Sequence, residues 1–202
     1  MKKRVDLPEK KYEGYIFDLD GTLVDSMPLH YRAWREALAR AGAPDHVFRA
    51  DEFYSCGGKS ANDVVRFLNE RYGMHMDAAS TAADKRRIYL EMLEKEGMQP
   101  IREVVEFVHS LGDAPKAIAT GSAMPGASRT LAAAGLSGLF DVILTPDEVE
   151  HGKPAPDMFL KAAELLGVSP DRCVVFEDAE PGMKAAAAAG MDCVQVLRPS
   201  LA

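Results

Sequence analysis

Three kinds of feature are scarce in this sequence, and each scarcity argues against a class of protein. Only three of the 202 residues are cysteines (Cys56, Cys173 and Cys193), and no Cys-x-x-Cys pair or Cys/His cluster occurs. This argues against a disulfide framework and against a zinc site. No apolar run is long enough to span a membrane, and acidic residues and a proline interrupt the first residues, so we expect no signal peptide. These absences predict a cytoplasmic protein with reduced thiols and no membrane association.

Basic tracts are missing as well. The sequence has 24 lysines and arginines against 31 aspartates and glutamates, for a formal net charge of −7. This balance argues against nucleic-acid binding, although a local basic pocket in an acidic protein can still hold an anionic ligand. The length fits one domain, or one domain with an insert, and 47% hydrophobic residues supply enough apolar surface for a substantial core.

What the sequence does have is a distinctive stretch at residues 15–26. Its first three residues are aromatic or β-branched and predict a short buried strand, and Gly21 ends the stretch of extended chain. Asp18 and Asp20 lie between this strand and Gly21. Two carboxylates at the end of a buried strand repel each other unless a cation or a shared proton reduces the repulsion. Mg²⁺ with oxygen ligands is the natural relief, but the stretch taken alone also fits a structural Asp-rich turn. An EF-hand loop is excluded, because Thr22 stands where a further ligand residue would be needed.

The rest of the chain divides into two patterns. Apolar spacings of three and four predict a nearly all-helical segment at residues 26–96, with a loop at 43–58 and Ser60 as a helix N-cap. From residue 97 on, helices alternate with short apolar strands, which is typical of a parallel α/β sheet that the first strand would join. We therefore expect an α/β core formed by residues 1–25 and 97–202, with residues 26–96 as a helical insert after the first strand. The later strands are expected at residues 116–120, 141–145, 173–177 and 193–197.

Polar residues close three of the predicted strands. Asp18 and Asp20 follow the first strand, a Thr-Gly-Ser run at 120–122 follows the second, and a Glu-Asp pair at 177–178 closes the fourth. Because ligands of open α/β sheets bind at the carboxyl ends of the strands, we expect these groups to meet at one edge of the sheet. The Thr-Gly-Ser run could hold phosphate oxygens at a helix N-terminus, or it could simply cap that helix, and both interpretations are open.

A lysine is placed in an unusually stiff stretch, Lys-Pro-Ala-Pro-Asp, which begins at Lys153. Pro154 keeps Lys153 out of helical angles, and Pro156 suits the first turn of the next helix. The lysine is either a functional cation or an ordinary solvated side chain. Glu177 and Asp178 present a similar choice between binding Mg²⁺ and capping the following helix, although two acids at the end of a buried strand are costly without a compensating partner.

In this order the motifs resemble those of the haloacid dehalogenase-like phosphohydrolase superfamily over nearly the whole chain. They are Asp18-Leu-Asp20-Gly-Thr22, Thr120, Lys153-Pro-Ala-Pro and Glu177-Asp178. The helical insert resembles the small α-helical cap of the subgroup that contains β-phosphoglucomutase and sugar-phosphate phosphatases. The resemblance implies a Rossmann-like core, Mg²⁺ as cofactor, and a small phosphorylated metabolite, a sugar phosphate, as the ligand of a monomeric enzyme.

The resemblance also implies a role for each motif residue. Asp18 would be the nucleophile that forms an aspartyl-phosphate, and Asp20 would be the general acid and base. Positioning and charge neutralisation dominate phosphoryl transfer, so the remaining residues would bind phosphate or metal. The implied phosphate-binding residues are Thr120 and Lys153, and Gly121 and Ser122 beside Thr120 are further candidates for substrate binding. The implied metal residues are Asp18, Asp20 through its main-chain carbonyl, Asp178, and Glu177 beside it. Because the family's dehalogenases lack an acid at the place of Asp20, dehalogenation is not expected.

The cap residues bear on the substrate and on the type of reaction. His30, Lys59 and Lys85 are candidates for substrate binding, with a structural or solvated role open for each. The subgroup's mutases hold a second phosphate with a cap arginine and a core lysine. At these places this sequence has Ser60, with Lys59 beside it, and Ala123. We therefore expect a phosphatase of sugar phosphates similar to fructose 1-phosphate. The alternatives are a β-phosphoglucomutase and, from another class, a non-catalytic protein that binds a phosphate ligand.

Overall fold

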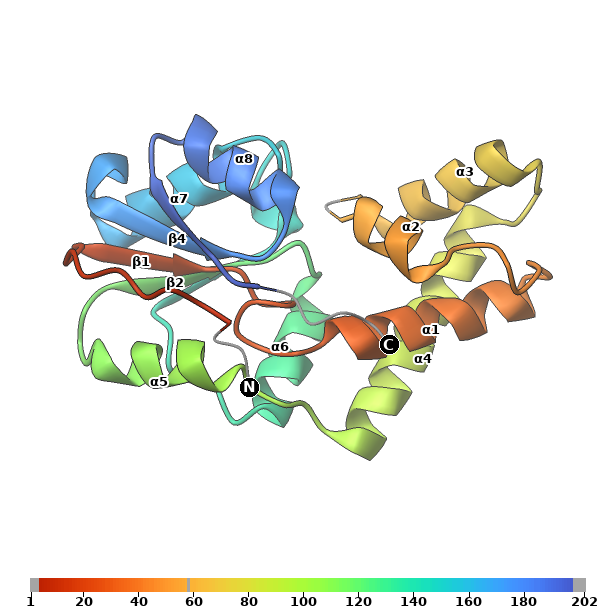
Figure 1. The fold of residues 1–202 in the computed structure, drawn as a ribbon, viewed down its shortest axis with the longest axis horizontal. Helices are drawn as coiled ribbons and strands as arrows, with labels where there is room; N and C mark the ends of the chain where they lie inside the picture. The colour runs from red at the N-terminus through yellow and green to blue at the C-terminus, as the bar shows by residue number, and fades with distance from the viewer. Residues whose placement is uncertain (1–3, 58, 198–202) are drawn as a thin grey trace. The chain divides into compact units, whose positions relative to one another are not determined.

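A computed structural model describes residues 4–57 and 59–197 of the chain (Figure 1). They form two compact units, an α/β unit made of residues 4–25 and 98–197, and a helical unit, Ser26–Gly97. We describe each unit by itself. The predicted core also includes residues 1–3 and 198–202, which lie outside the described residues.

The α/β unit contains a five-stranded sheet in the order β3-β2-β1-β4-β5, and every neighbouring pair of strands is parallel. In the central register, Ile16 lies opposite Ala117 on one side and Val175 on the other. This confirms the predicted α/β fold with a parallel sheet. The strands are β1 (Gly14–Phe17), β2 (Lys116–Ala119), β3 (Val142–Leu144), β4 (Cys173–Glu177) and β5 (Asp192–Gln195).

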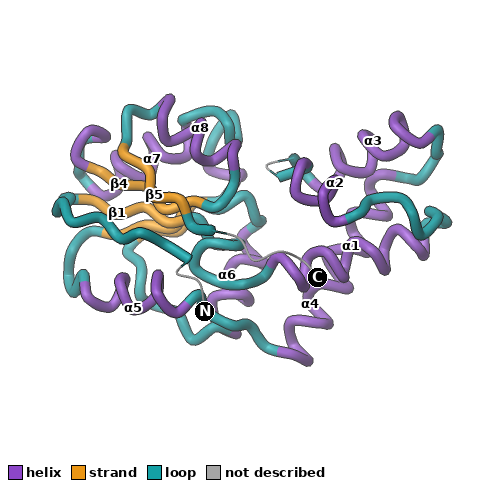
Figure 2. The backbone as a smooth tube through the Cα atoms, viewed as in Figure 1, coloured by secondary structure: helices purple, strands orange, loops and turns teal. Residues whose placement is uncertain are grey.

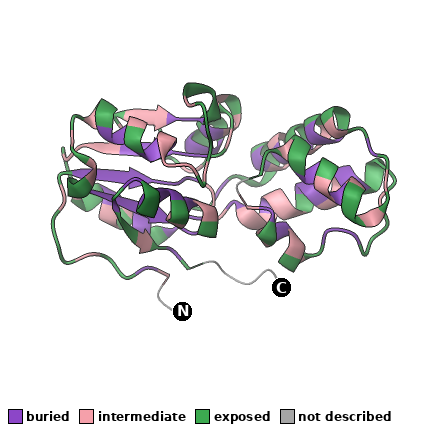
Figure 3. Cartoon of the chain, turned by 90° about the horizontal axis from the view of Figure 1, so that it is seen from above, coloured by how far each residue is buried: buried purple, intermediate pink, exposed green. Residues whose placement is uncertain are grey.

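Helices cover both faces of this sheet, with α7 and α8 on one face and α5 on the other (Figures 1 and 2). Successive side chains of β1 point to opposite faces. Ile16 packs in the core cluster that includes Phe159 of α7, whereas Phe17 stacks on Phe176 with ring centroids 4.6 Å apart. Phe107 of α5 lies 5.3 Å from Phe176, and the central strands are buried throughout (Figure 3). The helices are α5 (Arg102–Ser110), α6 (Met124–Ala133), α7 (Asp157–Leu166) and α8 (Glu180–Ala188).

The strand order determines where polar groups gather. The chain passes from β1 to β2 and β3 on one side, and then to β4 and β5 on the other, so β1 lies at the topological switch point. Ligands of such sheets bind outside the carboxyl ends of the strands at this point. The segments that follow β1, β2 and β4 carry residues that the sequence predicts to be catalytic, phosphate-binding or metal-binding.

Both connections to the helical unit belong to the α/β unit, and they pair with each other. The Asp25 amide donates a hydrogen bond to the Gln99 carbonyl at 2.9 Å, and the Ile101 amide donates to the Leu23 carbonyl at 2.8 Å. An antiparallel bridge between Val24 and residue 100 lies between these two bonds. The chain therefore leaves and re-enters the α/β unit at neighbouring points.

The described residues of the helical unit form four helices around an aromatic and aliphatic core. Trp34, Phe48, Phe53 and Leu68 belong to this core, and Ser60 caps α3 by accepting a hydrogen bond from the Asp63 amide at 3.2 Å. The N-cap expected at residue 60 is thus confirmed. The helices are α1 (Met27–Arg40), α2 (Ala50–Ser55), α3 (Ala61–Tyr72) and α4 (Ala78–Glu96).

The prediction of a loop over residues 43–58 is wrong, because the segment contains α2. This helix has only six residues, no side-chain cap, and a single buried residue, Phe53. A pattern with one buried position has no periodicity, so packing of the Phe53 ring against Tyr31 and Phe48 decides its structure. No helix within the described part of the chain is both long enough and apolar enough to cross a membrane.

Candidate active site

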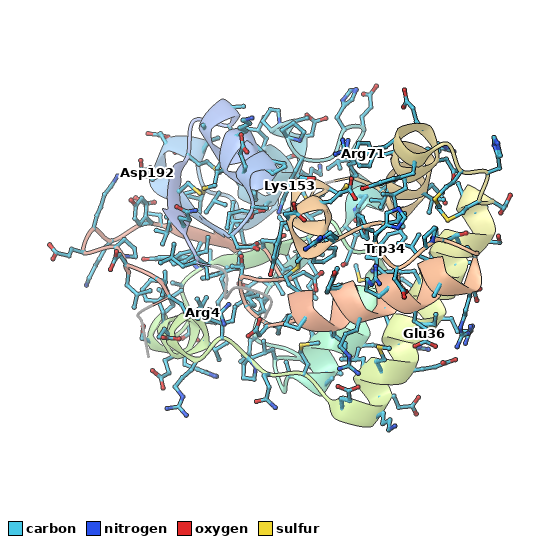
Figure 4. The ribbon with its side chains drawn as sticks, turned by 45° about the vertical axis from the view of Figure 1, so that its right-hand side comes forward. Arg4, Trp34, Glu36, Arg71, Lys153 and Asp192 are labelled. Atoms are coloured by element: carbon cyan, nitrogen blue, oxygen red, sulfur yellow. The ribbon has the colours of Figure 1, made fainter. Side chains whose placement is uncertain are left out.

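Lys153 lies at the centre of a buried cluster of charges in the α/β unit. Its Nζ donates hydrogen bonds to Asp18 Oδ1 and to Glu177 Oε1, each at 2.7 Å. Only 8% of the lysine side chain is exposed, and Figure 4 labels it among the surrounding side chains. The interpretation of Lys153 as an ordinary surface lysine is therefore wrong, because the proline-containing loop before α7 directs it inward to the carboxyl ends of β1 and β4.

Glu177 is fixed on both of its carboxylate oxygens. Oε1 accepts the bond from Lys153, and Oε2 accepts bonds from the main-chain amides of Asp178 and Ala179, each at 2.7 Å. Gly182 in the first turn of α8 makes this position accessible, since a Cβ added there would lie 1.8 Å from Glu177 Oε1. Glu177 thus holds the start of α8 to the end of β4 while it also pairs with the lysine.

Asp178 is brought against the loop that follows β1. Thr22 donates its hydroxyl proton to Asp178 Oδ1 at 3.3 Å, and a Cβ on Gly21 would lie 2.3 Å from Asp178 Oδ2. Gly21 also has φ +89°, which glycine adopts without strain. The glycine of the first motif therefore permits the close approach of the fourth motif, in addition to turning the chain.

The charges in this cluster do not balance. Asp18, Glu177 and Asp178 are all buried, and each offers a carboxylate oxygen within 4.8 Å of the others, whereas Lys153 supplies one ammonium group. Burial raises the pKa of Asp18 well above its ordinary value, the Lys153 ammonium opposes this rise, and the other two carboxylates add to it. Burial would lower the pKa of Lys153, but the Asp18 and Glu177 carboxylates reverse this and raise it. A surplus of buried carboxylates is relieved by a proton or a cation, and an all-oxygen cluster suits a hard divalent ion such as Mg²⁺.

The segment after β2 lies at the same edge of the sheet. Ser122 donates its hydroxyl proton to Asp20 Oδ2 at 2.6 Å, and the Ser122 amide donates to Thr120 Oγ1 at 3.1 Å. The N-cap of α6 is Ala123, without a side-chain cap, so the interpretation of these hydroxyls as helix caps is wrong. Gly121 between them is exposed.

The other three candidates for substrate binding belong to the helical unit. His30 Nδ1 and Lys85 Nζ lie 2.8 Å apart, and the His30 ring stacks on Tyr89 with centroids 4.0 Å apart. Lys85 also lies over the rings of Trp34 and Tyr89, at 5.6 and 5.4 Å. Lys59 lies 5.7 Å from the ring of Phe67. The structure thus joins His30 and Lys85 in one polar and aromatic cluster.

Some contacts of the cluster were not anticipated from the sequence. The motif contains Thr22, but its bond to Asp178 joins positions 156 residues apart and has no local signal. Gly182 follows a proline at a helix start, which marks the turn and gives no hint that Glu177 packs against it. The bond from Ser122 to Asp20 likewise depends on the alignment of β1 with β2.

Comparison with known proteins identifies the family. A family model described as haloacid dehalogenase-like hydrolase matches residues 12–190, so the chain belongs to this family, as its motifs predicted. Fructose-1-phosphate phosphatase YqaB of Escherichia coli is 38% identical over 93% of this chain and 97% of its own length. Hexitol phosphatase A of the same organism is 35% identical over 93% of this chain and 84% of its own length. A crystal structure of β-phosphoglucomutase from Clostridium difficile superimposes with a TM-score of 0.75 at 26% identity, covering 90% of this chain and 83% of that one.

Proposed function

We propose that the protein is a Mg²⁺-dependent phosphatase of small sugar phosphates that works through phosphorylation of Asp18. The observation that carries this proposal is the buried position of Asp18, which is held by Lys153 at 2.7 Å beside two further carboxylates. Asp20 follows two residues later, where it can serve as the acid and base. The names of the two Escherichia coli relatives support a phosphorylated sugar or hexitol as the substrate class.

In the first half of the reaction, an oxygen of Asp18 attacks phosphorus and the bond to the sugar oxygen breaks. Asp20 gives its proton to that oxygen, so the sugar leaves as a neutral alcohol. Lys153 orients Asp18 and offers positive charge to the phosphoryl oxygens, and the Thr120 hydroxyl donates to one of them.

In the second half, Asp20 takes a proton from water, whose oxygen attacks phosphorus. The bond between Asp18 and phosphorus then breaks, which releases phosphate and returns the carboxylate. Splitting the reaction into two displacements is the advantage of a covalent intermediate. Mg²⁺, held by Asp18, Asp178 and the main-chain carbonyl of Asp20, would neutralise charge on the phosphoryl group.

Glu177 has a different role in this proposal. Because both of its oxygens already accept hydrogen bonds, we assign it to holding Lys153 in place, while Asp18 and Asp178 supply the side-chain metal ligands. Residues 1–25 and 97–202 would then be the catalytic core and residues 26–96 the cap. Within the cap, His30, Lys59 and Lys85 would contribute to substrate recognition.

The mutase alternative has less support. Ala123 and Ser60, which occupy the positions of the mutases' phosphate-binding cations, serve as N-caps of α6 and α3. Neither position supplies positive charge for a second phosphate.

The test is phosphate release in Mg²⁺ from a panel of sugar and hexitol phosphates that includes fructose 1-phosphate and β-glucose 1-phosphate. The proposal expects release by the wild type and none by Asp18→Asn. Conversion of β-glucose 1-phosphate to glucose 6-phosphate with a bisphosphate primer, without phosphate release, would make the protein a mutase. Binding of phosphate without turnover of any substrate would favour the non-catalytic alternative.

A further inference from the structure

Resting on the proposed function, we propose that Ser122 is a positioning residue for the general acid Asp20 and does not bind the phosphoryl group. The hydroxyl of Ser122 donates to Asp20 Oδ2 at 2.6 Å, across 102 residues of sequence. A serine hydroxyl has one proton, so the proton given to Asp20 is not given to a phosphoryl oxygen. This reassigns a residue whose place in the Thr-Gly-Ser run suggested phosphate binding.

The turn after β2 divides its two hydroxyls between two tasks. The Ser122 amide donates to Thr120 Oγ1 at 3.1 Å, which fixes Ser122 relative to the buried Thr120. In that bond the Thr120 oxygen is only an acceptor, so its own proton is available for a phosphoryl oxygen. Thr120 therefore donates to the phosphoryl group, whereas Ser122 positions Asp20, the general acid.

A hydroxyl suits this task because it tolerates both forms of its partner. It donates to Oδ2 of the Asp20 carboxylate, and it can donate to the same oxygen of the carboxylic acid when Oδ1 carries the acid's proton. The same contact can thus hold Asp20 before it delivers a proton to the leaving oxygen and after it has done so.

The test compares two substrates that differ in their need for an acid. A sugar phosphate releases an alkoxide and requires protonation, whereas p-nitrophenyl phosphate releases a stable phenolate and requires little. For each substrate, kcat/KM reports the steps up to departure of the leaving group. We expect Ser122→Ala to lower kcat/KM for the sugar phosphate by about 100-fold, which is typical for loss of general acid catalysis, and to change kcat/KM for p-nitrophenyl phosphate little.

Three controls distinguish positioning from binding. Ser122→Thr keeps the hydroxyl and is expected to restore the activity on the sugar phosphate. Thr120→Val removes the hydroxyl assigned to the phosphoryl group and is expected to lower kcat/KM for both substrates. In an Asp20→Asn background, Ser122→Ala is expected to have almost no further effect, because residues that act together are not additive.

Equal losses on both substrates in Ser122→Ala, together with weaker inhibition by inorganic phosphate, would overturn the proposal and make Ser122 a phosphate ligand. If the wild type hydrolyses no phosphate ester, the proposed function fails and the contact itself is tested by NMR. The side-chain carboxyl ¹³C resonance of Asp20, identified by its absence in Asp20→Asn, is expected to move in Ser122→Ala and to stay near its wild-type position in Ser122→Thr. An unmoved resonance in Ser122→Ala would also overturn the proposal.

Discussion

At the scale of single residues, the site depends on one ammonium group that faces several buried carboxylates. Lys153→Met retains the volume of the side chain and removes its charge, which leaves Asp18 and Glu177 without their shared partner. We expect a loss of stability of about 3–5 kcal/mol in the metal-free protein, since removing one partner exposes the desolvation penalty of the other. We also expect kcat to fall by about 1,000-fold, which is typical for loss of a charged group that stabilises the transition state.

Denaturant unfolding and steady-state kinetics measure the two effects. Lys161→Met is the matched control, because Lys161 is 40% exposed on α7 and pairs only with Glu164 there. The free energy of unfolding of Lys161→Met should stay within about 0.5 kcal/mol of the wild-type value. If Lys153→Met were as stable and active as the control, Lys153 would contribute neither to stability nor to catalysis, against this expectation.

The pKa of Asp18 gives a prediction for pH and metal. Burial raises this pKa, so the folded protein holds the proton more tightly than the unfolded chain does. The stability of the metal-free protein should therefore fall as pH rises from the ordinary carboxyl pKa through the raised one. Mg²⁺ competes with the proton for the carboxylate, so it should raise Tm more at about pH 8 than at about pH 5.

Thermal unfolding with EDTA or with excess Mg²⁺ at both pH values tests this expectation. In Asp18→Asn, the pH dependence of the Mg²⁺ effect should be largely lost, since the titrating group is gone. An increase in Tm that is the same at both pH values in the wild type would contradict a metal site built on these carboxylates.

At the scale of elements, two helices offer a matched pair of glycines. Gly182 and Gly126 are each the third residue of their helix, after a proline, in α8 and α6. A Cβ on Gly182 would lie 1.8 Å from Glu177 Oε1, whereas a Cβ on Gly126 would meet nothing within 4 Å. We expect Gly182→Ala to displace Glu177 and with it Lys153, and to lower kcat/KM by about 100-fold, as small misplacements of reacting groups do.

Gly126→Ala should leave kcat/KM unchanged. Its free energy of unfolding should lie within about 1 kcal/mol of the wild-type value, and any change should be an increase, because alanine favours the helix. The comparison uses the same assay and the same unfolding experiment for both variants. Equal activity in the two variants would show that α8 does not support the site through Glu177.

The helices and strands were largely predictable from the sequence, but the side-chain contacts of the site were not. The strands and the helices that flank the site follow from apolar runs, alternation and glycine stops, and they place Asp18, Thr120 and Glu177 near the ends of parallel strands. The sequence does not give the direction in which each side chain points. It could not decide between a buried and a solvated Lys153, and it gave no sign of the hydrogen bond from Ser122 to Asp20. These side-chain contacts depend on the register between neighbouring strands, which the sequence does not show. The formation of α2 likewise depends on packing of the Phe53 ring, which the sequence does not show either.

At the scale of the whole molecule, the paired connections make the helical unit separable in principle. The amide of Asp25 bonds to the carbonyl of Gln99 at 2.9 Å, so residues 26–97 leave and re-enter at adjacent points. Replacing them with a short Gly/Asn turn should preserve the sheet, because the turn closes a connection whose ends already lie together.

We expect the shortened protein to fold, to bind Mg²⁺, and to hydrolyse p-nitrophenyl phosphate slowly. It should lose its preference among sugar phosphates, since the candidate recognition residues of the helical unit are gone. Circular dichroism, metal titration and the substrate panel measure these properties. A shortened protein that folds and keeps its full preference would place substrate recognition in the α/β unit.

The account as a whole makes Asp18 a nucleophile, and trapping its phosphorylated form tests this most directly. The protein is mixed in Mg²⁺ with a sugar phosphate that is radiolabelled in the phosphoryl group, and it is quenched in acid within one turnover. With radiolabelled p-nitrophenyl phosphate, whose leaving group needs little protonation, Asp20→Asn should retain more label than the wild type, because loss of the base slows hydrolysis of the intermediate. The account predicts label on the peptide that contains Asp18, sensitive to hydroxylamine, and none in Asp18→Asn. Rapid phosphate release with no label on the protein, together with full activity in Asp18→Asn, would contradict it.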